Sequence, residues 1–325
     1  MRRAALALLL LGLLAGAGAW EAMRRFEAPG PAAAPVQIVI PRGGTEAIAA
    51  ALQGAGVIED ARVFALATWA TRGQGPLRAA EFAIPAHASV AEVLAVLRQA
   101  RPVQRRVTIP EGLTARQIGA LLGRAEGLTG EAPALAEAAV LPETYAYQWG
   151  DDRAGLLRRA EAAMTQALAE SWAARAEGLP LASPREALIL ASIVERETSV
   201  AEERPRIAAV FLNRLRLGMM LQSDPTVAYA AAAGGVLERP LSRADLDREH
   251  PFNTYRVKGL PPGPIAAPGL AALRAVTRPA SSDELYFVAD GSGGHAFARS
   301  LEEHNRNVAR WREIERRRAD GLTAR

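Results

Sequence analysis

The spacing of hydrophobic positions divides the chain into three parts. An almost continuous apolar run comes first, at Ala4–Trp20; short apolar runs then alternate with helical patterns to about residue 103, and helical patterns dominate the remainder. Apolar residues three and four apart indicate amphipathic helices, whereas short runs bounded by turn residues indicate strands. We therefore predict an α+β protein with an N-terminal membrane segment, a small βααβ domain over residues 36–103, and a mixed α+β domain with a helical core over residues 104–325.

The first apolar run is about seventeen residues long and follows Arg2 and Arg3. Two interpretations fit it: a transmembrane anchor over residues 1–23, or a secretory signal cleaved at Ala17–Ala19. Under either interpretation, the rest of the chain is exported. Residues 24–35, which are rich in Pro, Ala and Gly, are predicted to form a linker.

Three Ile-Pro dipeptides, beginning at Ile40, Ile84 and Ile109, mark an internal repeat. In each copy a Thr or Ser follows the Pro by four residues, which predicts a short strand, a turn, and an amphipathic helix with that Thr or Ser as its N-cap. A further helix, Asp60–Thr71, lies between the first two copies. A strand, two helices and a strand in residues 36–103 resemble the LysM glycan-binding module. The alternative is a packing domain that only spaces the next domain from the membrane.

The central helix of the chain is predicted at Pro184–Thr198. The sequence Ser-Pro-Arg-Glu at residues 183–186 is a capping box with Pro at the first helical position. The helix is apolar on every side, so we expect it to be buried. It ends with two acids, Glu195 and Glu197, although burying a carboxylate is costly unless it is paired or protonated.

Glu195 and Glu197 are two residues apart, so helical geometry places them on nearly opposite sides. They therefore cannot form the closely spaced carboxylate pair of a retaining glycosidase. We expect at most one of them to act in chemistry, and the other to pair with an arginine such as Arg196 or Arg204. Apolar surroundings raise the pKa of a glutamate, which can then act as a general acid. The alternative is a buried glutamate that serves only the structure.

The rest of the larger domain alternates helices with polar loops, among them a loop at Pro142–Tyr145. Loops at Gln222–Thr226, Asn253–Tyr255 and Pro261–Gly263 offer polar and aromatic groups suited to a sugar. A short helix is predicted after its N-cap Asp224, a strand is predicted to reach Val257, and Glu284–Ala289 is predicted to form a hairpin with Ala296–Ala298. The other predicted helices are Thr114–Gly123, Thr129–Val140, Asp152–Gly178, Arg206–Leu217, Pro268–Thr277 and Ser300–Arg318.

Composition excludes several kinds of site. The 325 residues include no Cys, which excludes disulfides and thiolate chemistry, and the four His share no metal-ligand spacing. We therefore expect no metal and no cofactor. Ser192 lies one turn before Glu195, but no His or Lys is placed to activate it. The net charge is only +4 and the arginines are dispersed, which does not favour nucleic acid as a partner.

Six stretches between Ala191 and Phe297 together resemble one family. They read A-S-I-V-E-R-E-T from Ala191, F-L-N-R-L-R-L-G-M from Phe211, L-Q-S-D-P-T-V from Leu221, N-T-Y from Asn253, G-L-P-P-G-P-I from Gly259 and Y-F-V-A-D-G-S-G-G-H-A-F from Tyr286. On these motifs the chain resembles the MltG (YceG-like) endolytic murein transglycosylases. The resemblance extends from about Val36 to the C-terminus.

The resemblance implies a single-pass protein of the bacterial inner membrane, with a LysM-like domain beside the membrane and the catalytic domain on the extracytoplasmic side. It also implies cleavage of the MurNAc–GlcNAc β-1,4 bond inside nascent peptidoglycan strands, without water as nucleophile. Such cleavage leaves 1,6-anhydro-MurNAc ends and limits strand length. Glycan strands would be the substrate, and peptidoglycan synthases are expected partners. The alternatives are a non-catalytic murein-binding scaffold and a hydrolase that uses water.

The resemblance also assigns roles to residues. Glu195 matches the family's catalytic glutamate, which would protonate the glycosidic oxygen and then take the proton of the MurNAc C6 hydroxyl as that oxygen attacks C1. Glu197 and Ser192 are expected to support it. The residues predicted to bind substrate are Asn213, Arg214, Gln222, Ser223, Asp224, Thr226, Asn253, Tyr255, Pro262, Gly263 and His295.

Overall fold

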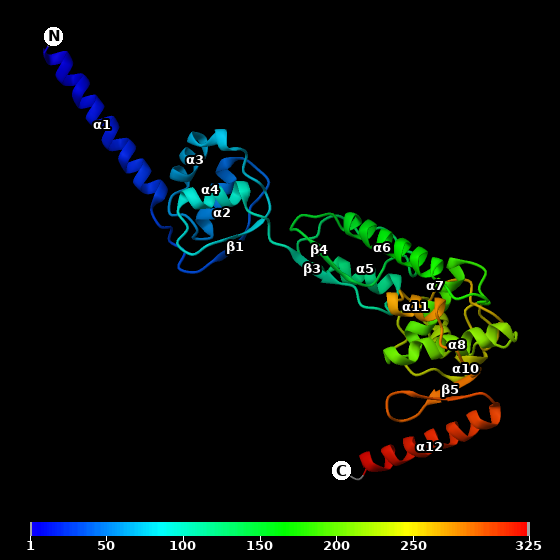
Figure 1. The fold of residues 1–325 in the computed structure, drawn as a ribbon. Coiled ribbons are helices and arrows are strands. Elements are labelled where there is room, and N and C mark those ends of the chain that lie inside the picture. Colours follow the sequence, from blue (N-terminus) through cyan, green and yellow to red (C-terminus); the bar gives the residue numbers. More distant parts are fainter. Residues whose placement is uncertain (1, 324–325) are drawn as a thin grey trace. The chain divides into compact units, whose positions relative to one another are not determined.

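A computed structural model describes the backbone of residues 2–323 and the side chains of residues 9–318 (Figure 1). The chain folds into two compact units. The first holds the chain up to Arg105 together with residues 126–128 and 146–151; the second holds residues 106–125, 129–145 and the chain from Asp152 onward. Helices and small two-stranded sheets make up the fold, which is the mixed α+β class that the sequence predicts.

The first unit begins with α1 (Arg2–Glu27) and then follows the predicted order of strand, helix, helix and strand. Its further elements are β1 (Val36–Val39), α2 (Thr45–Gly54), α3 (Ala61–Ala70), the 3-10 turn η1 (Arg72–Gln74), β2 (Glu81–Ile84) and α4 (Val90–Gln99). β1 and β2 are antiparallel, with Val36 opposite Ile84. One hydrophobic core holds the unit together, and its fully buried side chains include Leu52, Phe64, Phe82 and Leu97.

Two of the three repeat copies begin their helices as predicted. Ser89 caps α4 and Thr114 caps α5 (Ala115–Gly123), each within a complete capping box. The first copy differs, because Gly44 is the N-cap of α2 and Thr45 is already helical. A glycine takes the extended cap conformation without needing a side-chain acceptor. The prediction of Thr45 as a cap is therefore wrong.

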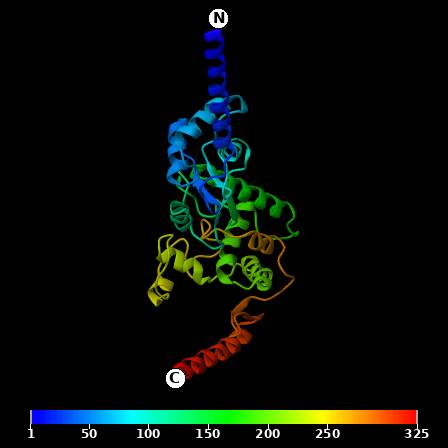
Figure 2. The same cartoon turned by 90° about the vertical axis from the view of Figure 1, so that its left-hand side faces the viewer.

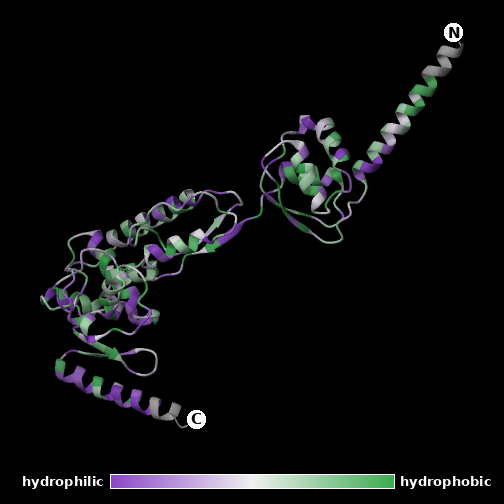
Figure 3. Cartoon of the chain, turned by 180° about the vertical axis from the view of Figure 1, so that it is seen from behind, coloured by the Kyte–Doolittle hydropathy of each residue, from purple (hydrophilic) through white to green (hydrophobic). Residues whose placement is uncertain are grey.

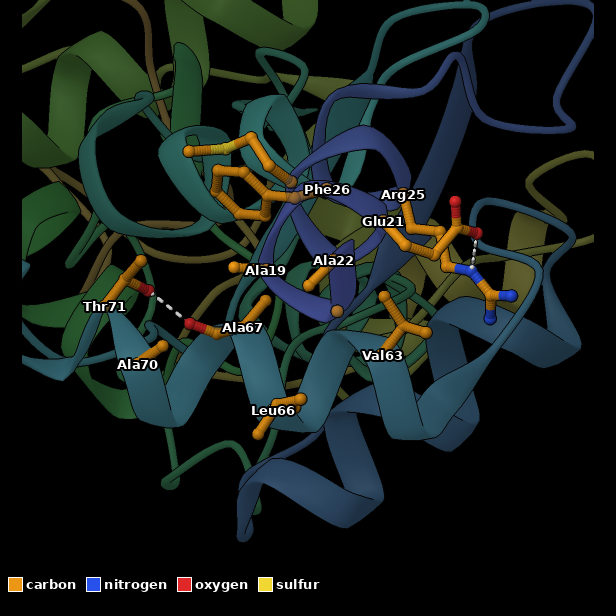
Figure 4. A pocket seen from close by; sticks show the side chains of 12 residues that line it. Ala19, Glu21, Ala22, Arg25, Phe26, Val63, Leu66, Ala67, Ala70 and Thr71 are labelled. Carbon is orange, nitrogen blue, oxygen red and sulfur yellow. Dashed lines mark hydrogen bonds and ion pairs between the residues drawn. The ribbon is translucent and has the colours of Figure 1, made fainter. Parts of the chain in front are cut away.

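α1 packs against α3 and α4 and leaves an apolar cavity of about 670 Å³ beside α3. Figure 4 shows its lining, with Ala22 and Phe26 from α1 and Val63 and Leu66 from α3. Among the residues whose side chains are described, no helix is long and apolar enough to cross a bilayer. The predicted membrane segment covers residues 1–23, so its first eight residues lie outside that described part.

The second unit is larger and mostly helical. A second sheet pairs β3 (Arg105–Thr108), within which the first unit ends, with β4 (Thr144–Tyr147). The elements that follow are α6 (Arg153–Ala173), α7 (Pro184–Glu197), η2 (Ala201–Glu203), α8 (Arg204–Arg216), α9 (Asp224–Ala231), α10 (Arg243–Asp247), α11 (Leu270–Thr277), β5 (Tyr286–Ala289), β6 (His295–Ala298) and α12 (Leu301–Thr323).

The helix α7 is the centre of the second unit's core. It contacts α6, α8, α9 and α11, and eight of its residues are buried. Leu190 and Ile193 are completely buried among Ile207 of α8, Leu273 of α11 and other apolar side chains. The prediction of a buried helix that is apolar all round is confirmed.

The β5–β6 hairpin and α12 form the end of the second unit. Figure 1 and Figure 2 both show the hairpin between α12 and the helical core, and β5 contacts α8 as well as α12. The strands pair in antiparallel register, with Phe287 opposite Phe297. In Figure 3, α12 is mostly hydrophilic, whereas the described part of α1 is mostly hydrophobic.

Several local predictions are wrong for identifiable reasons. Residues 129–140 form no helix: Pro133 lacks a backbone donor, and Ala138 has a φ of 58°, which is incompatible with a helix. The segment that reaches Val257 is a turn, since both Arg256 and Val257 bond back to Asn253. The predicted loop at 142–145 contributes Thr144 and Tyr145 to strand β4.

Candidate active site

The start of α7 is set by its cap. The Ser183 side chain accepts the Glu186 backbone N–H at 3.3 Å, and Pro184 is at the first turn, as predicted. The Glu186 carboxylate accepts from Ala182 N rather than from Ser183, so the predicted capping box is only half formed. Because the helix start is fixed, the rotation of Glu195 about the helix axis is also fixed.

Glu195 is 9% exposed and lies in the last turn of α7. Its Oε2 accepts the backbone N–H of Gly269 at 2.9 Å, and its Oε1 lies 3.1 Å from Nη2 of Arg204. Burial raises the pKa of Glu195, while the Gly269 N–H and Arg204 oppose that rise and the carboxyl group of Glu111 adds to it. A glutamate of this kind holds its proton at higher pH than an exposed one and can donate it.

Glu111 is the neighbour of Glu195 that the sequence reasoning missed. Its carboxyl group is within hydrogen-bond reach of Glu195, and its Oε2 lies 3.4 Å from the same Nη2 of Arg204. It belongs to the turn between β3 and α5. Two backbone hydrogen bonds of 2.8 Å join this turn to Ala267: Gly112 N donates to Ala267 O, and Ala267 N donates to Leu113 O. The sequence signal was the third Ile-Pro copy, in which Ile-Pro-Glu-Gly was interpreted only as a turn before a cap.

Gly269 makes the approach of these acids possible. A Cβ at this position would lie 1.7 Å from Oε1 of Glu111, which is far inside any contact distance. The glycine precedes α11 as its N-cap, so its N–H points out of a helix start towards Glu195. A helix N-terminus favours a negative group, and the Gly269 N–H can therefore stabilise the carboxylate form of Glu195 by donating to it.

Glu195 opens on a polar cavity of about 360 Å³. Arg196 on its wall donates from Nη1 to Gly112 O at 3.2 Å and so holds the Glu111 turn in place. The residues that line the cavity are Glu111, Gly112, Glu195, Arg196, Glu197, Thr198, Ser199 and Arg204. Both acids of α7 thus face one cavity, although they have different partners.

Glu197 is bound to a hydroxyl and not to an arginine. Its Oε1 accepts the hydroxyl of Ser223, which is 1% exposed. Burial and the nearby charge of Asp224 raise the pKa of Glu197 to about 7. The expectation that the non-catalytic acid would pair with Arg196 or Arg204 is wrong, because Arg204 binds Glu195 and Arg196 binds backbone.

The Gln222–Thr226 loop is held behind Glu197 by a network of hydroxyl groups. Thr254 Oγ1 accepts from Ser223 N at 2.9 Å and lies 2.8 Å from Thr226 Oγ1. Asp224 is not the N-cap of α9, since Ser223 occupies that position, and its carboxylate accepts the Tyr255 hydroxyl at 2.6 Å. Gln222 is exposed and has a φ of 49°, and its Oε1 accepts from Nη1 of Arg214 at 3.5 Å.

Other residues predicted to bind substrate lie in structural positions. Asn213 donates to Ser282 O and Glu284 O, and buried Arg214 donates to Leu285 O and Leu221 O. Both therefore hold the segments that flank the hairpin and the loop after α8. His295 on β6 is bound through Nδ1 to Glu203 at 2.7 Å, beside Thr198 of the cavity wall.

Ser192, Asn253, Pro262 and Gly263 lie away from the cavity lining. The buried Ser192 hydroxyl donates to Ile189 O at 2.7 Å and accepts from Ile265 N at 3.0 Å. Asn253 is 1% exposed and donates to three backbone carbonyls at residues 245–248. The carbonyl of exposed Pro262 accepts from Arg185. No group of three or more His, Cys, Asp or Glu among the described residues is placed to hold a metal ion.

The fold and the site together define an α+β protein built around a buried glutamate that faces a polar cavity. The chain matches the YceG-like family over residues 38–310, and it belongs to that family.

Two curated relatives are named endolytic murein transglycosylase. That of Bacillus subtilis (strain 168) is 36% identical over 170 residues, a match that covers 52% of this chain and 46% of the relative. That of Streptococcus pneumoniae serotype 2 (strain D39) is 30% identical over 325 residues, covering 84% of this chain and 58% of the relative. The chain thus spans about half the length of these relatives.

A solved structure is also similar. The crystal structure of a YceG-like protein from Listeria monocytogenes is 26% identical and superposes with a TM-score of 0.51. The match covers 84% of this chain and 98% of the Listeria chain. The fold described here is therefore a YceG-like fold.

Proposed function

We propose that this protein is an endolytic lytic transglycosylase that cleaves the MurNAc–GlcNAc β-1,4 bond of nascent murein strands. The observation that carries the proposal is Glu195, a buried acid with a raised pKa that opens on a polar cavity. Membership of the YceG-like family supports murein as the substrate, as do the names of the two curated relatives.

Glu195 acts first as acid and then as base. Its proton goes to the glycosidic oxygen as the bond to C1 breaks, and GlcNAc leaves as the new hydroxyl end. The carboxylate then takes the proton of the MurNAc C6 hydroxyl, whose oxygen bonds to C1 and closes the 1,6-anhydro ring. No water is consumed, and Glu195 ends protonated. The Gly269 N–H and Arg204 stabilise the carboxylate between the two proton transfers.

The carboxyl groups around Glu195 favour an internal nucleophile. Retaining glycosidases hold two carboxyl groups roughly 5–5.5 Å apart and inverting ones roughly 6.5–9.5 Å apart. Glu111 is close enough to share a hydrogen bond with Glu195, so the two cannot flank an anomeric carbon. Glu197 is engaged by Ser223. A single acid/base therefore suits this site, and the C6 hydroxyl of the substrate supplies the nucleophile.

The same proposal covers the glycan contacts of the protein, its attachment to the membrane and its protein partners. We place Gln222, Asp224 and Tyr255, at the rim beside Glu197, among the groups that contact the glycan. The N-terminal segment is proposed to attach the protein to the bacterial inner membrane, with the catalytic unit on the extracytoplasmic side. Peptidoglycan synthases that make the nascent strands are the proposed partners, and cleavage near them limits strand length.

The proposal is tested by the chemistry of the products. Purified full-length protein is incubated with uncrosslinked glycan strands, and the new ends are identified by mass spectrometry. We expect 1,6-anhydro-MurNAc ends, which are lighter by one water than reducing ends. Reducing ends would instead show a hydrolase, and binding to strands without new ends would show a scaffold.

A further inference from the structure

We propose that Glu111 is a positioning residue that keeps the catalytic proton on Glu195. The geometry is a carboxyl–guanidinium–carboxyl cluster in which one nitrogen, Nη2 of Arg204, reaches both acids, at 3.1 Å from Glu195 and 3.4 Å from Glu111. This inference rests on the proposed function, because it deepens the role of Glu195.

The charge balance of the cluster places a proton in it. With both acids ionised, one arginine faces two carboxylates and the buried group carries a net negative charge, which is costly to desolvate. One proton removes that charge. Its place follows from exposure: the Glu195 side chain is 4% exposed, whereas that of Glu111 is 42% exposed and remains hydrated when ionised.

Arg204 does not form a bidentate pair with Glu195. A bidentate pair uses two guanidinium nitrogens on one carboxylate. Here a single nitrogen is divided between two acids, and Nε of Arg204 is buried with no hydrogen-bond partner among the described residues. The charge of Arg204 is therefore shared between the two carboxyl groups and balances only one negative charge, so one of the two acids can keep its proton.

The other charged groups around Glu195 have different partners. Arg196 on α7 is directed to Gly112 O, and Glu197 is bound by Ser223. At the start of α11, the N-cap Gly269 donates its backbone N–H to the carboxyl group. Glu111 and Arg204 are thus the pair of opposite charges that sets the protonation of Glu195.

The test uses two substitutions with opposite effects on the pH profile. Glu111→Gln removes the like charge and leaves Arg204 to Glu195, so the alkaline limb of kcat/KM should move down by about one pH unit or more. Arg204→Gln should move it up. The matched control is Glu177→Gln, an exposed carboxylate after α6, which should leave the limb in place. An unmoved limb in Glu111→Gln, or shifts of both variants in one direction, would overturn the proposal.

A titration separates this inference from the proposed function. The carboxyl carbon of Glu195 is followed by NMR in protein labelled with ¹³C-glutamate and assigned by comparison with Glu195→Gln. Glu111→Gln should lower the observed midpoint whether or not murein is cleaved. If that midpoint does not move, Glu111 does not hold the proton, even where anhydro products are formed.

We infer a second site from a separate observation, the unpartnered face of α1 and α3 in the first unit. Leu66 and Trp69 of α3 are 61% and 63% exposed, and Trp20 of α1 is 68% exposed. Large apolar side chains rarely gather on a surface without a partner. Leu66 lines the apolar cavity between the two helices (Figure 4), and Trp20 follows the exposed leucines at 9–14 along α1.

The occupant that fits this face is an anionic bilayer surface. The Arg72 guanidinium lies 4.6 Å from the centre of the Trp69 ring and that of Arg24 lies 5.9 Å from the centre of the Trp20 ring, so each tryptophan has a cation over its ring. Tryptophan with a neighbouring arginine is typical of the boundary between acyl chains and headgroups. We therefore expect α3 to rest in the membrane interface beside α1, independently of any catalytic activity.

Fluorescence quenching tests this placement. Full-length variants that keep one tryptophan each, Trp69 or Trp149, with the others changed to Phe, are reconstituted in phosphatidylglycerol vesicles with brominated acyl chains. Trp69 should lose more than half of its emission relative to unbrominated vesicles, and Trp149 should lose little. Equal quenching of the two, or none at Trp69, would show that α3 does not enter the interface.

Discussion

Glu195 and Glu197 lie two residues apart on one helix, yet their surroundings give them different chemistry. Burial raises the pKa of both. Glu195 meets a backbone N–H, an arginine and a second acid, whereas Glu197 meets a serine hydroxyl within a network of threonines. Burial by itself therefore does not distinguish a reactive acid from a structural one. The distinction comes from partners that can stabilise both the protonated and the ionised form.

The strongest way to break this comparison is to neutralise each acid in turn. Glu195→Gln should reduce the formation of anhydro ends by about 10²–10⁴-fold, the usual contribution of a general acid/base. Glu197→Gln should stay within about tenfold of wild type, because its amide can still accept from Ser223. Product rates are measured by mass spectrometry, with circular dichroism to confirm folding. An inactive Glu197→Gln beside an active Glu195→Gln would reverse the assignment.

A smaller effect is expected from the glycine that gives Glu111 its place. In Gly269→Ala the new Cβ meets the Glu111 carboxyl group and displaces it or the α11 start, which should lower kcat by about 10²-fold through misplacement of Glu195. Gly263→Ala is the matched control, because its Cβ would lie an ordinary 3.7 Å from Phe252. Equal rates for the two variants would mean that the close approach of Glu111 is unimportant.

The next effect in size is the contribution of Glu197 to the pH dependence of the free energy of unfolding. The pKa of Glu197 rises from its ordinary 4.5 to about 7 on folding, so between these values the folded chain binds more protons than the unfolded chain. Stability should therefore fall as pH rises from 4.5 to 7 and then level off. Urea unfolding across pH 4–8 should show a smaller fall in Glu197→Gln than in wild type. Parallel curves for the two proteins would contradict a raised pKa at this position.

The smallest effect is expected for Ser192, which lies one turn before Glu195 on α7. Ser192→Ala removes the acceptor of the Ile265 N–H and should cost about 1–3 kcal/mol in the free energy of unfolding. Activity should be unchanged, because Ser192 does not line the cavity. Urea unfolding and the product assay measure the two quantities. A loss of activity without a loss of stability would give Ser192 a role in catalysis.

Local sequence patterns predicted the elements whose signals are local. The Ser183 cap, the apolar faces of α7 and the hairpin of β5 and β6 each depend on residues close in the chain, and the structure contains all three. The helix predicted at residues 129–140 is absent because Gly130 and Ala138 have positive φ and Pro133 lacks a backbone donor, and these outweigh an apolar spacing that favours a helix. Periodicity reports which face is apolar, but it does not report backbone dihedrals.

The candidate site was predicted only in part. The motif match chose Glu195, but the partners of Glu195 come from distant segments: Glu111 lies 84 residues before it, and Gly269 lies 74 residues after it. Helical geometry separated Glu195 from Glu197 but could not show that both face one cavity. Polar residues such as Asn213 and Asn253 were predicted to bind substrate because they lie in the motifs, whereas the structure uses their amides to hold backbone carbonyls.

The two backbone hydrogen bonds that join the Glu111 turn to Ala267 also bear on when the protein can become active. They connect segments about 155 residues apart, and such contacts form late because a long loop must close first. Before they form, Glu195 lacks both its acidic neighbour and its backbone donor. In a chain that is still emerging from the ribosome, or in one cut before Ala267, Glu195 therefore lacks the partners that the proposed acid/base chemistry needs. On the proposed function, cutting of the wall begins only after the segment around Ala267 and Gly269 has been made and has folded against the Glu111 turn.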